Sequence, residues 1–317
     1  MKIAFVTGVT GQDGAYLSQI LLKKGYEVIG ITRSKSASDL HRIEYLKIKN
    51  KLKLEECDLL NIDQIIRLIR QYQPTEIYNL SAQSSVFLSF KEPMSTMQNN
   101  FLTVINLLEG IRAVNEKIKF FQAASSEIYG DSTTLPITES SILHPLSPYA
   151  ISKASAHWFC DNYRKSYGLF ISSGVLFNHE SYLRGDSFFV KKVIRAAIAI
   201  SKNQQDILKV GNIDVERDFG YAPKYAEAMY LIMQNDKPDD FLICSGQSVS
   251  LRMIIEYLFD KLSIDKNKIV IDKELYRPTD VKEIYGSNDK IKRMLNWDYS
   301  LNFYQVLDLL LEEELKN

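Results

Sequence analysis

The sequence has almost no excess of charge of either sign. Its 317 residues include 39 lysines and arginines against 39 aspartates and glutamates, so the formal net charge is zero. A protein that binds nucleic acid or an anionic membrane over a broad surface usually carries a marked positive excess. We therefore expect no nucleic-acid partner and no membrane partner, and any anionic ligand must be met by a local cluster of positive charge.

Cysteine and histidine are scarce as well. The three cysteines, Cys57, Cys160 and Cys244, are odd in number and widely spaced, and the four histidines show no metal-ligand spacing. These patterns argue against a disulfide framework and against a zinc site. We expect small buried thiols, no metal and a reducing, cytoplasmic location.

Long apolar runs and linkers are missing too. The apolar start of the chain stops at Gly8, which is too short for a secretory signal, and no later run reaches membrane-spanning length. The sequence shows no Gly/Ser-rich or Pro-rich linker and no internal repeat. Two lobes in close contact are therefore expected, rather than domains separated by a tether.

The first half of the chain does contain an alternation of short apolar runs with amphipathic stretches. This alternation is typical of a doubly wound α/β fold with a parallel sheet. Strands are predicted at residues 2–7, 27–31, 52–55, 76–80, 119–124 and 169–176, and helices at 15–24, 62–72, 95–114 and 149–167.

Beyond residue 178 the pattern becomes irregular. Helices are predicted at residues 187–203, 223–235, 251–262 and 301–315, and short strands at 241–244 and 268–271. We expect residues 1–178 to form a dinucleotide-binding domain that carries the catalytic residues. Residues 179–317 are expected to form a smaller, mixed substrate-binding lobe, closely packed against the first domain and able to interleave with it.

Three glycines follow the first predicted strand. Gly8, Gly11 and Gly14 have the spacing G-x-x-G-x-x-G and lie where the strand gives way to the first helix. Glycine permits a tight turn and lets a pyrophosphate approach the backbone N–H groups at a helix N-terminus. The pattern predicts a dinucleotide site, although a purely structural turn would use the same residues.

The second predicted strand ends next to a positive charge. Arg33 stands where an NAD site usually has an acidic residue for the ribose 2′-hydroxyl. A guanidinium suits a 2′-phosphate instead, so NADP is the predicted cofactor, with a solvated basic loop as the alternative. Asp58 and Leu59 follow the third strand, near the expected adenine, and Ser81 and Ala82 follow the fourth, near the expected ribose.

Tyr149 and Lys153 are four residues apart on a predicted helix and therefore share one face. Ser147 is a candidate N-cap for this helix, and Pro148 suits its first turn. A lysine ammonium beside a phenol favours the phenolate, which can take a hydroxyl proton while hydride leaves the same carbon. The alternative is a surface tyrosine and a solvated lysine.

Ser125, Ser126 and Glu127 end the fifth predicted strand. In an open parallel sheet, ligands bind beyond the carboxyl ends of the strands. A carboxylate placed there can act first as a base and then as an acid, which plain hydride transfer does not need. Glu127 therefore predicts elimination of water by way of a transient oxidation, unless it only caps a helix or lies on the surface.

With these residues the sequence resembles the extended short-chain dehydrogenase/reductases that act on nucleotide sugars, and among them the GDP-mannose 4,6-dehydratase family. The Gly11–Gly14 loop and the string Phe177–Ser181 are its most specific parts. The resemblance extends over nearly the whole chain, through residues 7–14, 76–80, 82–84, 126–130, 147–150, 176–181, 217–220 and 277–278.

The resemblance implies a Rossmann-like fold and a GDP-sugar substrate that is oxidised at C-4, loses water across C-5 and C-6, and is reduced at C-6. The implied catalytic residues are Ser125, Glu127, Tyr149 and Lys153. The implied NADP contacts are Gly8, Thr10, Gly11, Gln12, Asp13, Gly14, Arg33, Asp58, Leu59, Leu80, Ser81, Ala82, Tyr149, Lys153, His179 and Arg184. The implied substrate contacts are Ser84, Ser85, Ser126, Asn178, Lys192, Gly211, Arg217 and Arg277.

The resemblance also implies a homotetramer or a homodimer, with residues 33–42 reaching a neighbouring subunit. The chain departs from the family at several positions, which concern the sugar more than the reaction type: Ser34, Ser85, Ser125, Tyr182, Leu183 and Tyr221. Three alternatives stay open: a dehydratase of another GDP-sugar such as a GDP-heptose, a nucleotide-sugar epimerase or 4-ketoreductase, and a non-catalytic NADP-sensing module.

Overall fold

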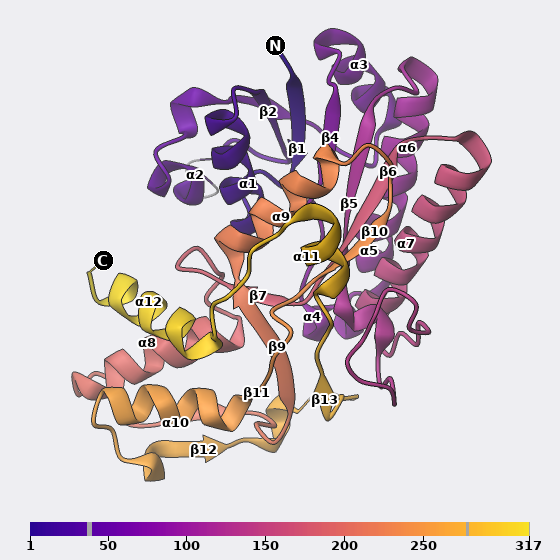
Figure 1. The fold of residues 1–317 in the computed structure, drawn as a ribbon. Helices are drawn as coiled ribbons and strands as arrows, with labels where there is room; N and C mark the ends of the chain where they lie inside the picture. The colour runs from indigo at the N-terminus through magenta and orange to yellow at the C-terminus, as the bar shows by residue number, and fades with distance from the viewer. Residues whose placement is uncertain (37–39, 277–278, 317) are drawn as a thin grey trace.

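A parallel sheet forms the centre of the molecule in the computed structural model, which describes residues 1–36, 40–276 and 279–316 (Figure 1). Across these residues seven strands pair in the order β10-β6-β5-β4-β1-β2-β3, all parallel. They are β1 (Ile3–Thr7), β2 (Glu27–Thr32), β3 (Lys53–Glu56), β4 (Glu76–Asn79), β5 (Lys119–Ser125), β6 (Ile171–Leu176) and β10 (Asp240–Ile243). The predicted α/β fold with a doubly wound parallel sheet is confirmed.

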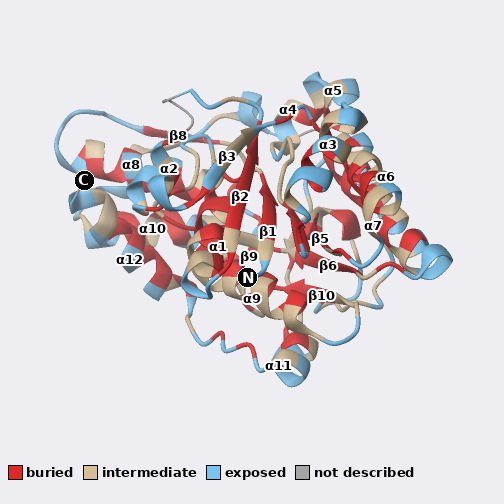
Figure 2. Ribbon diagram, turned by 90° about the horizontal axis from the view of Figure 1, so that it is seen from above, coloured by how far each residue is buried: buried red, intermediate tan, exposed pale blue. Residues whose placement is uncertain are grey.

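Helices cover both faces of this sheet, and its central strands are buried (Figure 2). One face is covered by α1 (Gln12–Lys23), α9 (Ala222–Gln234) and α11 (Asp289–Leu295), and the other by α3 (Ile62–Tyr72), α6 (Thr103–Val114) and α7 (Pro148–Tyr167). Burial on both faces explains why the central strands β1, β2, β5 and β6 are mainly apolar rather than an alternation of apolar and polar residues.

The predicted helix at 95–114 is interrupted. It consists of α5 (Pro93–Met97), a π-helical turn (Gln98–Leu102) and α6. The turn contains Asn100, whose buried amide accepts from the Gln83 backbone N–H at 2.8 Å and donates to the Gln83 carbonyl at 3.0 Å and to Ser152 Oγ at 3.0 Å. Helical turns of this kind are frequent near functional sites.

The C-terminal part forms a second lobe below the carboxyl ends of the central strands (Figure 1). Its helices are α8 (Phe189–Ser201), α10 (Leu251–Lys261) and α12 (Phe303–Lys316), which share one apolar core. Its strands are β7 (Asn178–Glu180), β8 (Leu208–Val210), β9 (Glu216–Tyr221), β11 (Ser248–Ser250), β12 (Ile269–Ile271) and β13 (Glu283–Ile284).

Several short elements are absent from the sequence prediction. They are α2 (His41–Tyr45), α4 (Val86–Lys91), α11 and the strands β7, β8, β9, β11 and β13. Most span too few residues to show a hydrophobic period. The predicted helix at 223–235 and strand at 241–244 do form, as α9 and β10. Both belong to the first sheet rather than to the second lobe: β10 pairs with β6, and α9 packs against the sheet. No helix of the described residues is both long and apolar enough to cross a membrane.

Candidate active site

The glycine loop joins β1 to α1 in a turn that depends on its glycines. Gly8 has a φ of +65°, and its N–H donates to the Ile31 carbonyl at 3.2 Å. A Cβ on Gly14 would lie 2.3 Å from the Gly8 carbonyl oxygen, and a Cβ on Gly8 would lie 2.9 Å from the Leu80 carbonyl oxygen. The loop thus turns tightly against β4 and presents its backbone at the N-terminus of α1.

A cleft of about 490 Å³, here called the dinucleotide cleft, opens at this loop. It contains twelve of the sixteen predicted cofactor residues: Gly8, Thr10, Gly11, Gln12, Asp13, Gly14, Arg33, Leu59, Leu80, Ser81, Ala82 and Arg184. Ser84, predicted to contact the substrate, lines the same cleft. A glycine cradle with arginine side chains around it fits a dinucleotide phosphate.

Two predicted cofactor residues, Asp58 and His179, do not line the dinucleotide cleft themselves but contact segments next to it. Asp58 caps the segment after β3, where its carboxylate accepts from the Leu60 N–H at 3.0 Å. The His179 ring is buried: its Nε2 lies 2.9 Å from Asp13 Oδ1 and its Nδ1 lies 2.6 Å from the Phe177 carbonyl oxygen. His179 therefore holds Asp13 in the loop.

The electrostatics of Asp13 agree with that arrangement. Burial alone would raise the pKa of its carboxyl, but the His179 ring, the Gln12 amide and the Arg184 guanidinium outweigh burial and lower that pKa to about 2. Gln12 also accepts from Ser181 Oγ at 2.8 Å and donates to the His179 carbonyl at 3.2 Å. The loop is thereby tied to the residues that follow β6.

The four predicted catalytic residues meet at the carboxyl end of β5. Ser125 ends the strand and accepts from the Glu127 N–H at 3.4 Å. Tyr149 stands in the first turn of α7, where Ser147 accepts from the Ala150 N–H at 3.1 Å as the expected N-cap. Burial raises the pKa of Tyr149 to about 12, with a contribution from the Glu127 charge, while a hydrogen bond with Ser125 lowers it.

Lys153 lies one turn further along α7 and is buried. Its buried Nζ donates to the Ala123 carbonyl at 2.9 Å and lies 6.0 Å from the centre of the Tyr149 ring. Burial lowers the pKa of Lys153 to about 8. Stabilisation of the Tyr149 phenolate by this ammonium stays a prediction.

Glu127 faces a second, narrow cleft of about 20 Å³, here called the Glu127 cleft. Three residues predicted to contact the substrate line it with Glu127: Ser126, Asn178 and Arg217. Arg217 forms an ion pair with Asp280 at 2.7 Å, and Asn178 donates to the Asp218 carbonyl at 3.2 Å. A base and a cation thus face the same space.

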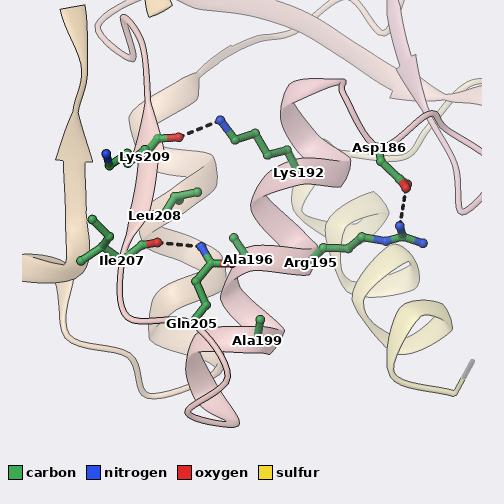
Figure 3. Close-up of a pocket in the computed structure, with 9 residues that line it drawn as sticks. All are labelled: Asp186, Lys192, Arg195, Ala196, Ala199, Gln205, Ile207, Leu208 and Lys209. Carbon is green, nitrogen blue, oxygen red and sulfur yellow. Dashed lines mark hydrogen bonds and ion pairs between the residues drawn. The ribbon is translucent and has the colours of Figure 1, made fainter.

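The remaining predicted substrate residues are dispersed. Lys192 lines a separate cleft of about 570 Å³ beside α8, where its Nζ donates to the Lys209 carbonyl at 2.8 Å (Figure 3). Ser85 caps α4 by accepting from the Leu88 N–H at 3.2 Å, and a Cβ on Gly211 would lie 2.8 Å from the Leu275 carbonyl oxygen. Arg277 lies outside the described residues.

Several residues at the site are missing from the sequence prediction, among them Arg42 and Asn100. Arg42 lines the dinucleotide cleft from α2, a helix too short to be predicted. Asn100 fixes the backbone of Gln83, next to Ser84, from within the π-helical turn. Asn100 is buried in an otherwise amphipathic stretch, and a polar residue on an apolar face was the available signal. The described residues contain no group of three side chains placed to hold a metal ion.

Comparison with known proteins places this site in a family. A family model described as GDP-mannose 4,6 dehydratase matches residues 5–310. GDP-mannose 4,6 dehydratase 1 of Arabidopsis thaliana is 40% identical over 326 aligned residues, which cover 99% of this chain and 90% of that protein. The human GDP-mannose 4,6 dehydratase is 36% identical, covering 96% of this chain and 89% of that protein.

Solved structures share the fold. RMD from Pseudomonas aeruginosa, complexed with NADPH, aligns with a TM-score of 0.83 and 26% identity over 99% of this chain and 98% of that one. A dTDP-glucose 4,6-dehydratase from Bacillus anthracis, in complex with NAD, aligns with a TM-score of 0.87 and 20% identity over 100% of this chain and 97% of that one. From the family model and the relatives together, the chain belongs to the GDP-mannose 4,6-dehydratase family.

Proposed function

We propose that the protein converts GDP-mannose to GDP-4-keto-6-deoxymannose by internal oxidation, elimination of water and reduction. The observation that carries this proposal is the position of Glu127, close enough to Tyr149 for its charge to raise the tyrosine pKa. A redox tyrosine needs no neighbouring carboxylate for hydride transfer alone, but removal of a proton from carbon does need a base.

Each residue then has a defined task. Tyr149 takes the proton from the C-4 hydroxyl, and the resulting ketone acidifies the C-5 proton. Glu127 takes the C-5 proton and, with Ser125 hydrogen-bonded to the sugar, protonates the departing C-6 hydroxyl. A nicotinamide ring bound in the dinucleotide cleft would supply the acceptance of hydride from C-4 and its return to C-6. As C-6 is reduced, a proton returns to C-5. Because the hydride is returned, the cofactor is regenerated within each turnover.

The proposed cofactor is NADP, and the relatives support a nicotinamide dinucleotide in general. P. aeruginosa RMD is complexed with NADPH and the B. anthracis dehydratase with NAD. Arg33 favours NADP because it follows β2 and lines the cleft where an acidic residue would bind the ribose of NAD. Ser34, beside it, accepts from the Ser36 N–H at 3.1 Å and shapes the same loop.

The nucleotide diphosphate is proposed to bind through Arg217, Lys192, Gly211 and Arg277, the last of which lies outside the described residues. Arg217 now pairs with Asp280, and a cleft of about 20 Å³ does not hold a hexose. Binding therefore requires Arg217 to exchange the Asp280 carboxylate for the substrate phosphates. In this proposal residues 1–178 bind the cofactor and carry the catalytic groups. Residues 179–317 mainly bind the nucleotide sugar. Two of their elements belong to the first domain, because β10 pairs with β6 in the first sheet and α9 packs against that sheet.

A homo-oligomer, as a tetramer or a dimer, is proposed on the exposed apolar face of α7. Ile151 and Trp158 are seven residues apart, on one side of the helix, and are 46% and 55% exposed. Large exposed aromatic side chains on one helix face favour a protein contact. The three cysteines are buried free thiols, which supports the proposed cytoplasmic location.

The experiment incubates purified protein with GDP-mannose and no added cofactor and follows the sugar nucleotide by mass spectrometry. Loss of one water is expected for the wild type and for Glu116→Gln, which changes an exposed glutamate on a loop. Glu127→Gln should bind cofactor and fold as the wild type does but lose activity by about 10²- to 10⁴-fold, the usual contribution of a general base.

Four results would contradict the proposal or part of it. Consumption of NADPH by a keto-sugar, with GDP-mannose left intact, would indicate a 4-ketoreductase, and inversion without water loss would indicate an epimerase. Water loss from a GDP-heptose but not from GDP-mannose would keep the reaction and change the sugar. Full activity of Glu127→Gln would remove Glu127 from the mechanism.

A further inference from the structure

A row of buried polar side chains crosses the first sheet on the face that α7 covers. Thr7, Asn79 and Gln122 are paired in register on the adjacent strands β1, β4 and β5, so their side chains point to the same face. The residues two positions earlier on these strands share that face and belong to the apolar core beneath α3, α6 and α7: Phe5, Ile77 and Phe120. The apolar layer thus becomes polar at the carboxyl ends of the three strands.

This polar row forms one continuous chain of hydrogen bonds. Thr7 Oγ1 donates to Asn79 Oδ1 at 2.7 Å, and Asn79 Nδ2 donates to Gln122 Oε1 at 2.9 Å. Gln122 Nε2 in turn donates to the Ala123 carbonyl at 3.0 Å. The three side chains are at most 1% exposed. Because all the donors point in the same direction along the row, each hydrogen bond polarises and strengthens the next.

Both ends of the polar row reach the candidate active site. At one end Thr7 Oγ1 accepts from the backbone N–H groups of Leu80 and Ser81, both at 3.1 Å, and these two residues line the dinucleotide cleft. At the other end the Ala123 carbonyl also accepts from Lys153 Nζ, at 2.9 Å. The lysine and the polar row therefore share one oxygen atom.

The fold alone does not require polar side chains at this depth. Burying a polar group costs free energy unless it is hydrogen-bonded, and a bonded pair can be replaced by apolar groups of the same shape at little cost. Apolar residues at these three positions would simply extend the core that lies next to them. What the polar side chains add is a fixed orientation for the Ala123 carbonyl and, through it, for Lys153.

We infer that Gln122 positions the ammonium group of Lys153, because it holds the Ala123 carbonyl to which that group is bound. The rest of the polar row orients Gln122. The inference deepens the proposed function and rests on it, since Lys153 is there a catalytic residue beside Tyr149. Gln122 is a positioning residue, because it acts on the reaction only through Lys153.

The first test follows the titration of Lys153 by NMR of isotope-labelled lysine, with its signal assigned from Lys153→Met. Burial lowers the pKa of Lys153, whereas Asp13 and Cys160 raise it. Gln122→Glu adds a carboxylate beside the shared oxygen, which favours the charged ammonium and should raise the pKa of Lys153 by about 1 or more. Gln122→Met removes the competing donor from the carbonyl and should raise that pKa by less.

The second test measures the rate of water loss from GDP-mannose. Both Gln122 variants should lower kcat by about 10- to 100-fold with little change in KM, because Lys153 loses its fixed position while the substrate contacts remain. The alkaline limb of the rate should move to higher pH together with the NMR titration. Gln71→Glu makes the same change at an exposed glutamine of α3, and this matched control should alter neither measurement.

An unchanged Lys153 titration in a folded variant overturns the inference, even where its rate or melting temperature falls, because Gln122 would then be structural only. Wild-type kcat in both variants overturns it as well. Should Gln122→Met fail to fold, the double variant Asn79→Leu/Gln122→Met decides, since it removes both partners of a buried hydrogen bond. A wild type that leaves GDP-mannose intact refutes the dehydratase reaction instead. The NMR titration needs no substrate and still decides whether Gln122 acts on Lys153.

Discussion

Asp218 is a buried carboxylate whose ionisation should make the stability of the protein depend on pH. It lies in β9 next to Arg217 and is inaccessible to solvent. Within the described residues it accepts from the Ser245 N–H at 2.8 Å, from Ser245 Oγ at 2.7 Å, from the Gly246 N–H at 3.0 Å and from the Gly286 N–H at 3.4 Å. It thereby ties β9 to the turn after β10 and to the segment after β13.

The magnitude follows from the pKa of this group. Burial raises the pKa of Asp218 from 3.8 to about 6, although the hydrogen bonds from Ser245, Gly246 and Gly286 lower it. This difference corresponds to about 3 kcal/mol between the protonated and ionised forms. The pKa of Asp218 is higher in the folded protein than in the unfolded chain. Its contribution to the free energy of unfolding is therefore fully present below pH 3.8 and is lost as the pH rises through about 6. Between pH 4.5 and pH 7 the expected loss is about 2 kcal/mol.

Asp218→Asn isolates this effect, since the amide does not titrate. Its NH₂ group would face backbone N–H donors, so the variant should be destabilised at pH 4.5 by about 1–3 kcal/mol for each donor left without an acceptor. Toward pH 7 the wild type loses stability through ionisation of Asp218, whereas the variant has no group there to ionise. The difference in free energy of unfolding between the two proteins should therefore narrow by about 2 kcal/mol. Urea unfolding followed by circular dichroism at both pH values measures the gap, and Asp289→Asn, an exposed acid in α11, is the control. A gap that stays constant from pH 4.5 to pH 7 would refute the reasoning.

Three further results are expected. Gly14→Ala should weaken NADPH binding and destabilise the loop by about 1–3 kcal/mol, because its Cβ would lie 2.3 Å from the Gly8 oxygen. Gly25→Ala has open space but a φ of +82°, so it should cost stability while leaving binding intact in the same titration. Burial lowers the pKa of Lys153 to about 8, so the rate of water loss should fall as the pH rises above 8, and a rate that stays constant there would exclude a role for the ammonium. Trp158→Glu should reduce the mass measured by light scattering during gel filtration, and an unchanged oligomer would place the contact elsewhere.

The sequence predicted the sheet well because most of its strands are apolar runs of useful length; β3, which reads KLEE, is an exception. β1, β2 and β5 lie within two residues of their predicted bounds, and α3 matches its prediction at both ends. Burial on both faces selects such runs, and the helices between them show a clear amphipathic period. The second lobe offered less, since β8, β11 and β12 have three residues each and show no period.

Which side chains meet was harder to predict than which elements form. Gly8, Gly11 and Gly14 were found because backbone geometry restricts their positions to glycine. Arg42 gave no such signal, because an arginine in a short helix looks like a surface residue until the fold brings it to Thr10 and Leu183. Sequence spacing also could not show that Lys153 Nζ donates to the Ala123 carbonyl, because residues four apart share a helix face whether or not their polar atoms touch.

The short strand β7 connects the two halves of the proposed reaction. Successive side chains of a strand point to opposite faces, so Asn178 and Glu180 lie on one side and His179 on the other. Asn178 lines the Glu127 cleft, whereas His179 holds Asp13 in the glycine loop. β7 also pairs with β9, so that His179 is opposite Gly220 in the strand that carries Arg217 and Asp218. β7 therefore lies between the two clefts, with Asn178 facing one of them and His179 contacting the loop that lines the other.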